Sequence, residues 1–222
     1  KVEEVLENEF LSPLNRLGLA PHAPYSVSPD LFRYLGQLAQ KYHCPFSCHV
    51  AEVQDEVRFL DGGDDSLAKL LKERSAWDPQ WQAPGKTPVQ YLDSLDLLDR
   101  LIAIHCNFVS ADLDVMAEKK VSAVFCPNST KWFGRTEFMP VRALLDLGVN
   151  VALGTDSRAS NDSLNFLDEL RMADELLPDV SRKEILAMAT CAGGEALGLQ
   201  CGKLALGQQA DLIGFCVSPS YS

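Results

Sequence analysis

Short, almost entirely apolar runs alternate along the chain with longer amphipathic segments. Runs without a polar residue at every second position are typical of parallel strands that are buried on both faces. Five runs are predicted as strands, over residues 17–20, 45–50, 101–106, 121–127 and 150–156. The segments between them predict helices over 28–42, from Ser110 onward, over 141–149 and over 163–177. This alternation predicts an α/β fold built from right-handed βαβ units.

Two of these helices carry clear local signals. Ser28 followed by Pro29 is typical of a helix that begins with a capping residue and a proline in its first turn. In the segment 163–177, Leu164, Leu167 and Leu170 recur at helical spacing, and we expect them to form its buried stripe.

Two segments depart from the pattern. Residues 61–90 hold two of the three tryptophans, and both a lid that determines specificity and a surface insertion that packs on itself fit them. Residues 201–217 contain Gly202, Gly207 and a β-rich run, and we expect a hairpin that leaves the main domain. The predicted division is therefore a main domain over 1–200 and part of a small β domain over 201–222.

Composition excludes several classes of function. The net charge is −11 and the isoelectric point about 4.8, so binding to nucleic acid is not expected. No apolar stretch approaches the length of a membrane helix. The seven cysteines include no CxxC pair, which favours reduced thiols and a cytoplasmic location. The sequence opens without Met or a signal peptide, so we expect a processed or partial chain.

Polar residues with chemical potential follow each predicted strand. In a parallel barrel the chemistry lies at the carboxyl ends of the strands. Those ends carry His22, His49, His105, Asn128 and Asp156. The fourth histidine, His43, follows a helix and is interpreted as a partner of the helix dipole.

Imidazole and carboxylate groups are good ligands for zinc or iron. His49 and Asp156 are therefore candidate metal ligands, and a bound metal would convert water to hydroxide near neutral pH. Glu52 could then carry a proton, and His105 could orient the water or stabilise an oxyanion. Each feature alone also has a structural explanation, but their order on successive strands favours a site.

Six segments together resemble the amidohydrolase superfamily, in the branch that contains cytosine, guanine and S-adenosylhomocysteine deaminases and triazine chlorohydrolases. The resemblance begins near residue 17 and covers the C-terminal part of such a protein. Its motifs are "PHAPYSVS" (21–28), "CHVAE" (48–52), "IHC" (104–106), "CPNST" (126–130), "LGTDSRASNDSL" (153–164) and "GKLALGQQADLIGF" (202–215).

The resemblance implies a distorted (β/α)8 TIM-type barrel, here its C-terminal strands, with part of a small β-sandwich at the C-terminus. It implies that His49 and Asp156 bind a metal and that Asp156 also acts as a base. It further implies that Glu52 is the proton shuttle and that His105 lies beside the reacting water. Substrate contacts are implied for His22, Ser129 and Arg135, and a structural role for Asn161.

One departure from the family is large. The family's first strand carries an HxH pair of metal ligands, and this sequence has no HxH. We therefore expect a missing N-terminal barrel segment that carries this pair and closes the barrel. In members of the family with two metals, a modified lysine bridges them, and this sequence has no lysine in a suitable place. One divalent ion is therefore expected, with zinc favoured and iron as the alternative. A homodimer is compatible with the resemblance.

Three functional hypotheses remain open at this point. The first is hydrolytic deamination of an aminated heterocycle, such as an aminopurine nucleoside, through a metal-bound hydroxide. The second keeps the metal but changes the reaction to that of a chlorohydrolase or a cyclic amide or imide hydrolase. The third is a non-catalytic fragment or binding subunit. The HxxE pair at 49–52 and "PHAPYS" favour the first. Arg158 could pair with an anionic substrate, but a surface ion pair is equally compatible with its position.

Overall fold

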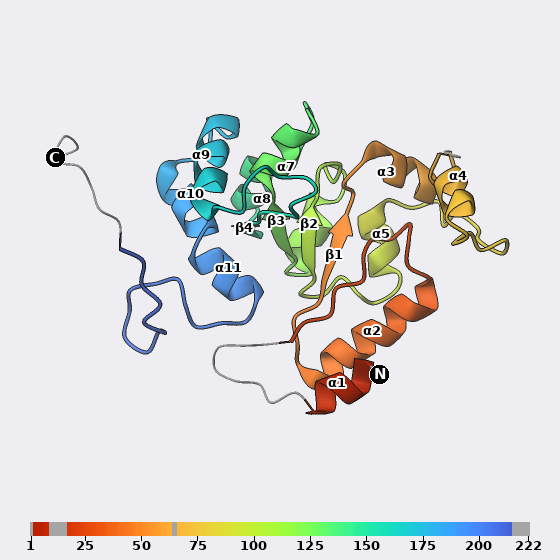
Figure 1. Ribbon diagram of the computed structural model, residues 1–222, viewed down its shortest axis with the longest axis horizontal. Helices are drawn as coiled ribbons and strands as arrows, with labels where there is room; N and C mark the ends of the chain where they lie inside the picture. Colours follow the sequence, from red (N-terminus) through yellow and green to blue (C-terminus); the bar gives the residue numbers. More distant parts are fainter. Residues whose placement is uncertain (1, 9–16, 64–65, 215–222) are drawn as a thin grey trace.

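A computed structural model gives the fold of residues 2–8, 17–63 and 66–214. A four-stranded parallel sheet lies at its centre, in the order β1-β2-β3-β4 (Figure 1). The strands are β1 (Ser47–Val50), β2 (Ile102–His105), β3 (Ser122–Phe125) and β4 (Asn150–Leu153). Four of the five predicted strands are thus confirmed, with their order along the chain preserved across the sheet.

The fifth predicted strand, 17–20, is reduced to a single parallel bridge between Leu19 and Phe46. The backbone N–H of Leu19 donates to Pro45, and its carbonyl accepts from Ser47. Pro21 has no N–H with which to continue the ladder. The chain therefore follows β1 closely without forming a regular strand, and the prediction was wrong in that respect.

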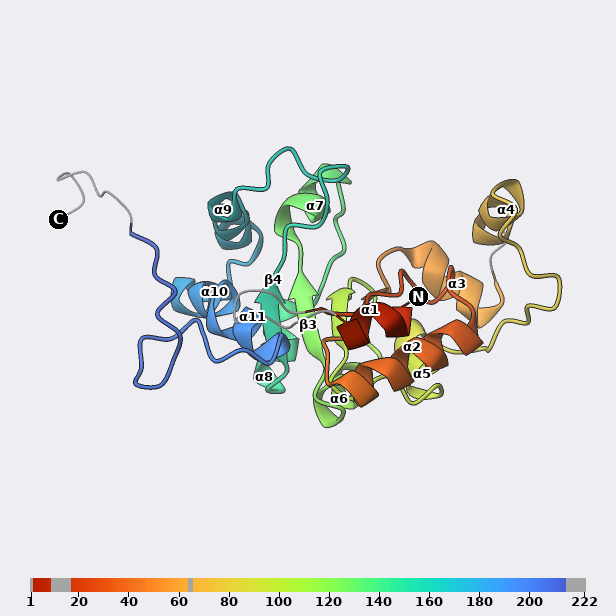
Figure 2. The same ribbon diagram turned by 60° about the horizontal axis from the view of Figure 1, so that its bottom comes forward.

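The described ranges contain eleven helices. They are α1 (Val2–Asn8), α2 (Pro29–Tyr42), α3 (Gln54–Asp61), α4 (Ser66–Glu73), α5 (Pro88–Asp93), α6 (Leu113–Glu118), α7 (Pro127–Trp132), α8 (Val141–Asp146), α9 (Phe166–Leu176), α10 (Arg182–Met188) and α11 (Cys191–Ala196). Helices α8, α10 and α11 pack on β4, while α7 continues from the end of β3 and packs against α9 (Figure 2). None of them is long and apolar enough to span a membrane.

Helix α2 has the predicted boundaries. The Ser28 hydroxyl accepts a hydrogen bond from the N–H of Leu31, and Pro29 occupies the first turn. His43 ends the helix with a left-handed backbone (φ 50°), and its N–H bonds to the last carbonyls. The interpretation of His43 as a residue of the helix end is confirmed.

Two other helices begin later than the sequence pattern predicts. The helix expected from Ser110 starts after Asp112, and the one expected from 163 starts after Asn165, whose side chain accepts from Leu167. Leu164 consequently precedes α9 and is 52% exposed. The buried positions of α9 are instead Glu169 and Ala173. A search for apolar residues at helical spacing does not find Glu169, because its side chain is charged.

The strand registers align His49, Ile104, Val124 and Ala152 in one row across the sheet. The alternate positions face the helices and form the core; they include Cys48, Val50, Ala103, Ala123, Phe125 and Val151. The other face, through Ile104 and Val124, borders a cavity of about 710 Å³. One face of the sheet is thus filled by helices and the other opens onto this cavity.

The segment 61–90 contains α4 and the start of α5. The ring of Trp81 stacks on Phe59 of α3 with centroids 5.3 Å apart, and Trp77 meets the same ring edge-on. These contacts match the alternative in which the insertion packs on its own neighbourhood. Its role as a lid stays a prediction.

The predicted hairpin is not present in the described part of the tail. Residues 201–214 form turns without a strand, and 215–222 lie outside the described residues. Leu204, Leu206, Leu212 and Ile213 are all at least 70% exposed. A two-stranded hairpin is marginal without further strands to cover it. The division at residue 201 and the β-sandwich therefore stay predictions.

Candidate active site

Two histidines and a glutamate from the ends of neighbouring strands form a compact cluster. His49 belongs to β1, Glu52 follows it, and His105 ends β2. Glu52 Oε2 lies 3.4 Å from His49 Nδ1 and 3.6 Å from His105 Nε2. One ligand atom from each residue lies within 4.8 Å of the others. These three predicted site residues therefore come together.

The backbone at these strand ends adopts left-handed conformations that are uncommon outside glycine. The φ angles are 50° at Ala51, 73° at His105, 49° at Cys106 and 56° at Asp156. Each such residue costs of order 1–3 kcal/mol, and such strain gathers at functional sites. All four positions lie at the carboxyl ends of β1, β2 and β4, beside the cluster.

His22 reaches the cluster from the "PHAPYS" loop. Its carbonyl accepts a hydrogen bond from the N–H of His49, and the two rings have centroids 5.3 Å apart. Ser26 Oγ lies 2.6 Å from His22 Nδ1 and fixes the ring. Burial lowers the pKa of His22, so the imidazole is largely neutral at neutral pH.

Arg135 enters from the loop after α7. Its Nη2 lies 2.8 Å from Glu52 Oε1, and its guanidinium stacks on Phe133. The side chain is only 12% exposed, and its buried Nη1 makes no hydrogen bond. Arg135 thus combines an ion pair to Glu52 with an unsatisfied donor.

Asp156 follows β4, and two hydroxyls hold its Oδ2. Ser129 Oγ donates at 2.9 Å and Ser160 Oγ at 2.5 Å. Burial alone would raise the pKa of Asp156, but the hydrogen bonds from Ser160 and Ser129 lower it below its usual value. The carboxylate is held charged and in a fixed orientation. Its negative charge favours the protonated forms of His49 and His105.

The charges of the cluster depend strongly on one another. Burial would raise the pKa of Glu52, yet the hydrogen bond to His49 and the charges of His105 and Arg135 lower it to about 2. The hydrogen bond to Glu52 raises the pKa of His49. Burial lowers the pKa of His105 to about 4. A charged carboxylate therefore lies beside a largely neutral imidazole.

The donor set is suited to a divalent metal. His49 Nδ1 and His105 Nε2 are both buried, and neither makes a hydrogen bond of good geometry. Their contacts with Glu52, at 3.4 and 3.6 Å, are long, and buried nitrogens that are poorly hydrogen-bonded are costly unless another group satisfies them. The carboxylates of Glu52 and Asp156 supply the negative charge that zinc or iron requires. The compact group contains Glu52 and His105 beside His49, whereas the sequence singled out His49 and Asp156.

Some predicted residues lie away from the cluster. Arg158 is exposed and donates to the carbonyl of Asp162, as expected for a surface residue. Asn161 is buried and donates to the carbonyl of Thr155 and to Glu169, which agrees with a structural role.

Four contributors were missed from the sequence: Ser160, Asn107, Glu56 and Glu169. Ser160 has a signal in "SRAS", since a hydroxyl four residues after an aspartate can turn back to it. Glu56 and Glu169 look like ordinary residues of a first helical turn, where acidic side chains are common. Only their burial distinguishes them.

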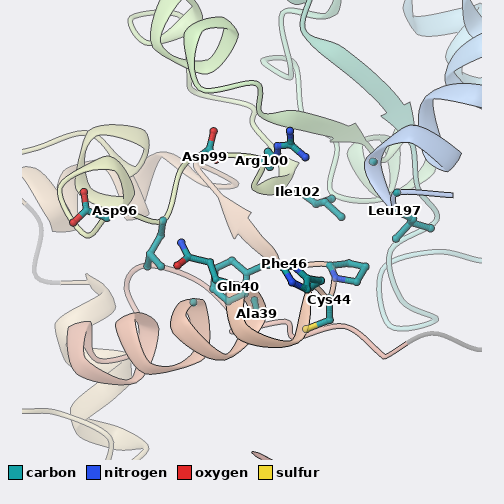
Figure 3. Close-up of a pocket in the computed structure, with 15 residues that line it drawn as sticks. Ala39, Gln40, Cys44, Phe46, Asp96, Asp99, Arg100, Ile102 and Leu197 are labelled. Atoms are coloured by element: carbon teal, nitrogen blue, oxygen red, sulfur yellow. The ribbon is translucent and has the colours of Figure 1, made fainter. Parts of the chain in front are cut away.

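A second pocket, of about 560 Å³, lies at the opposite end of the sheet (Figure 3). Phe46 and Ile102 line it at the starts of β1 and β2, with Ala39, Gln40 and Leu197 from the neighbouring helices. It contains none of the predicted site residues. The cluster at the carboxyl ends is therefore the candidate site.

Residues 4–217, almost the whole chain, match the amidohydrolase family. The chain belongs to the amidohydrolase family. The resemblance inferred from the six motifs is confirmed, and so is the TIM-barrel class of the fold.

The curated relatives carry the names of nucleoside deaminases. The chain is 37% identical over 210 residues to the 5-methylthioadenosine/S-adenosylhomocysteine deaminase of Pyrococcus furiosus, which covers 90% of this chain and 45% of the relative. It is 33% identical over 208 residues to the 5'-deoxyadenosine deaminase of Methanothermobacter thermautotrophicus, with 89% and 44% coverage. The chain thus spans less than half the length of these relatives.

Solved structures agree with the fold. An adenosine deaminase from Xanthomonas campestris with bound zinc superimposes with a TM-score of 0.77 at 32% identity, covering 94% of this chain and 45% of the other. The atrazine chlorohydrolase of Arthrobacter aurescens complexed with zinc gives 0.73 at 26% identity, with 93% and 44% coverage. Both neighbours contain zinc, and they differ in the reactions that their names describe.

Proposed function

We propose that this chain is the carboxyl-terminal part of a metal-dependent hydrolase that deaminates an adenosine-type nucleoside. The observation that carries the proposal is the cluster of His49, Glu52 and His105, in which two buried imidazole nitrogens face one carboxylate at 3.4 and 3.6 Å. The deaminase names of the relatives support the substrate class. In the reaction, water and the aminopurine yield the corresponding oxopurine and ammonia.

His49 and Asp156 are the proposed metal ligands of this chain, with zinc as the favoured ion and iron as the alternative. When bound, such an ion lowers the pKa of a coordinated water and acts as a Lewis acid. Ser129 and Ser160 keep the Asp156 carboxylate in one orientation for this purpose. Asp156 also serves as a base toward the reacting water.

Glu52 is the proposed proton carrier. Its carboxylate takes one proton from the attacking water and delivers it to the ring nitrogen. The second proton of the water, accepted by Asp156, goes to the leaving amine, which departs as ammonia. The low pKa of Glu52 keeps it in the accepting form before the reaction. His105, buried and largely neutral, can donate a hydrogen bond to the oxygen that develops negative charge.

His22, Ser129 and Arg135 are the proposed substrate contacts. His22 lies beside His49 and is held by Ser26, so its other nitrogen can face a bound nucleoside. Arg135 offers an unsatisfied buried N–H beside Glu52. Ser129 is buried in the first turn of α7, which follows β3, and donates a hydrogen bond to Asp156.

Two ligands from this chain are fewer than the three that a catalytic metal site ordinarily requires. We propose that a further protein segment with an HxH pair supplies the remainder and covers the open sheet face. Coverage of about 45% of the relatives is compatible with such a segment. The predicted cytoplasmic location and the homodimer stay predictions.

Dechlorination of a triazine is the second candidate, because a zinc-containing atrazine chlorohydrolase shares the fold. Both reactions replace a ring substituent by water-derived oxygen, and they differ in the leaving group. A cyclic amide or imide hydrolase, or a non-catalytic subunit, remains the expectation if neither leaving group is released.

The test is an assay of the complete zinc-loaded protein with 5'-methylthioadenosine, S-adenosylhomocysteine and atrazine, measuring ammonia and chloride separately. We expect one ammonia for each nucleoside consumed and no chloride. Chloride release alone would favour the second candidate. Neither product from a folded, zinc-loaded protein would contradict the catalytic proposal.

A further inference from the structure

Two buried glutamates occupy equivalent positions in the fold. Glu56 and Glu169 are both 0% exposed, and within the described ranges no other glutamate is buried. Each lies in the first turn of a helix, α3 or α9, and a proposed site acid, Glu52 or Asp156, lies in the connection between that helix and the preceding strand. Burial of a carboxylate is costly unless donors compensate it. Their hydrogen bonds indicate what they hold.

The carboxylate of Glu56 accepts hydrogen bonds from the backbone next to and at Glu52. Its Oε1 accepts from the N–H of Ala51 at 3.1 Å, and its Oε2 accepts from the N–H of Glu52 at 3.0 Å. Ala51 has a left-handed backbone, a conformation that a free loop would rarely keep. Glu56 therefore stabilises a turn that is strained in isolation.

The same turn is held from its carbonyl side by a different element. Asn107, buried after β2, donates from Nδ2 to the carbonyl of Glu52 at 2.9 Å. The backbone N–H groups of Asn107 and Phe108 both donate to the carbonyl of Ala51. The Glu52 peptide is thus bonded on both sides by buried groups.

Glu169 makes the corresponding contacts near Asp156. Its Oε1 accepts from Asn161 Nδ2 at 2.6 Å, and its Oε2 accepts from the N–H of Asn128 at 3.0 Å. Asn161 also donates to the carbonyl of Thr155, the residue before Asp156. Asn128 precedes Ser129, which bonds the Asp156 carboxylate. Glu169 therefore ties the first turn of α7 to the loop that precedes α9, and both segments contribute residues that orient Asp156.

We propose that Glu56 and Glu169 are paired positioning residues, Glu56 for the proton carrier Glu52 and Glu169 for the metal ligand Asp156. This inference rests on the proposed function for the roles of Glu52 and Asp156. The hydrogen bonds of Glu56 and Glu169 exist independently of that function. The two substitutions should have different effects, whereas a general loss of stability would affect both variants in the same way. Changing Glu56 affects proton transfer, and changing Glu169 affects retention of the metal.

The first test is Glu56→Gln in the complete zinc-loaded protein. The amide keeps the size but offers one acceptor, so its NH2 group faces an N–H donor. We expect amide hydrogen exchange at Ala51 and Glu52 to become at least tenfold faster. In the deamination assay, kcat falls about 10- to 100-fold while KM and zinc affinity change less than twofold.

The second test is Glu169→Gln. We expect zinc affinity, measured by competition with a chelator, to fall about 10- to 100-fold. At saturating zinc, kcat returns to within about threefold of the parent protein, because ligation is then restored by mass action. Exchange at Ala51 and Glu52 is unchanged.

Glu184→Gln is the matched control. Glu184 lies in the first turn of α10, where it accepts hydrogen bonds from the N-cap residue Ser181 and pairs with Arg142. None of these contacts involves a residue of the candidate site. The control substitution should leave kcat, zinc affinity and the exchange of Ala51 and Glu52 unchanged. If Glu56→Gln or Glu169→Gln fails to fold, Asn107→Ala removes the hydrogen bond to the carbonyl of Glu52, and Asn161→Ala removes a donor to Glu169.

The outcomes are distinct. Unchanged exchange at Ala51 and Glu52 in Glu56→Gln, or equal losses of zinc in both glutamate variants, would overturn the proposal. If the parent protein binds zinc but deaminates nothing, the proposed function fails. The positioning roles of Glu56 and Glu169 are then still tested by hydrogen exchange and by zinc affinity, because neither measurement requires turnover.

Discussion

The rings of His49 and His105 meet edge to face, with centroids 4.9 Å apart and planes at 89°. His105 pairs in register with Val50, not with His49. Since neighbouring residues of a strand point to opposite faces, a regular β2 would direct His105 away from His49. The left-handed backbone of His105 (φ 73°) turns its ring back toward the open face. A strained residue thereby brings two imidazoles together.

Replacing Glu52 by Gln tests the proposed proton carrier. The amide cannot accept a proton from water at neutral pH, so we expect kcat for deamination to fall about 100- to 10,000-fold. Zinc content should be unchanged, because His49 and Asp156 remain. Deamination kinetics and elemental analysis of the same samples check this. A variant with normal kcat would remove Glu52 from the chemistry.

Arg135 tests the proposed substrate contacts. Arg135→Ala removes the ion pair to Glu52 and the unsatisfied donor at Nη1. We expect KM to rise about tenfold, which corresponds to about 1.4 kcal/mol. Arg158→Ala is the control, since Arg158 is exposed and bonds only a loop carbonyl among its described hydrogen bonds. Equal effects of the two variants on KM would contradict a specific role for Arg135.

The sequence was sufficient to predict the sheet and the end of it at which the candidate site lies. Four strands could be read from apolar runs, because burial on both faces leaves little room for polar residues. His22, His49, His105 and Asp156 could be predicted to lie near one another because parallel strands end on the same side. Glu52 followed from its spacing after His49.

The remaining features depend on three-dimensional contacts. Leu19 lies in an apolar run but lacks the neighbours of a regular strand. The turn at His105 reflects local strain that no residue pattern announces. Glu56 and Glu169 are acidic residues at helix starts, and only tertiary structure buries them. Sequence patterns record burial of apolar side chains far better than burial of charged ones.

Leu144 tests the packing beneath β4. Its side chain, in α8, is fully buried in the core. Leu144→Ala should lower the free energy of unfolding by about 2–5 kcal/mol, through lost transfer energy and the cavity left behind. Leu186→Ala on α10 is the control, because Leu186 is 56% exposed, and should change it by less than about 1 kcal/mol. Urea denaturation gives both values.

Glu184 predicts a pH dependence of stability. The hydrogen bonds from Arg142 and then from Ser181 lower its pKa to about 2, below the ordinary value of 4.5. A carboxyl with a lowered pKa in the folded state stabilises the protein above its unfolded pKa, and this is lost as pH falls through the folded value. Because Glu184 is exposed, the effect should be small.

Glu184→Gln should therefore have a lower urea midpoint than the parent protein at pH 6. The two midpoints should converge as the pH falls below about 4.5 toward 2. A constant difference over this range would show that the charge of Glu184 contributes nothing.

The most direct test of the account is the zinc content of the complete protein, measured by elemental analysis beside His49→Gln and His43→Gln. His43 is the matched control because it ends α2, outside the cluster. We expect about one zinc per protomer in the parent and in His43→Gln, and a loss of most of it in His49→Gln, since the His49 imidazole is a proposed ligand. Folded protein without zinc, or equal zinc in all three, would contradict a metal site at His49.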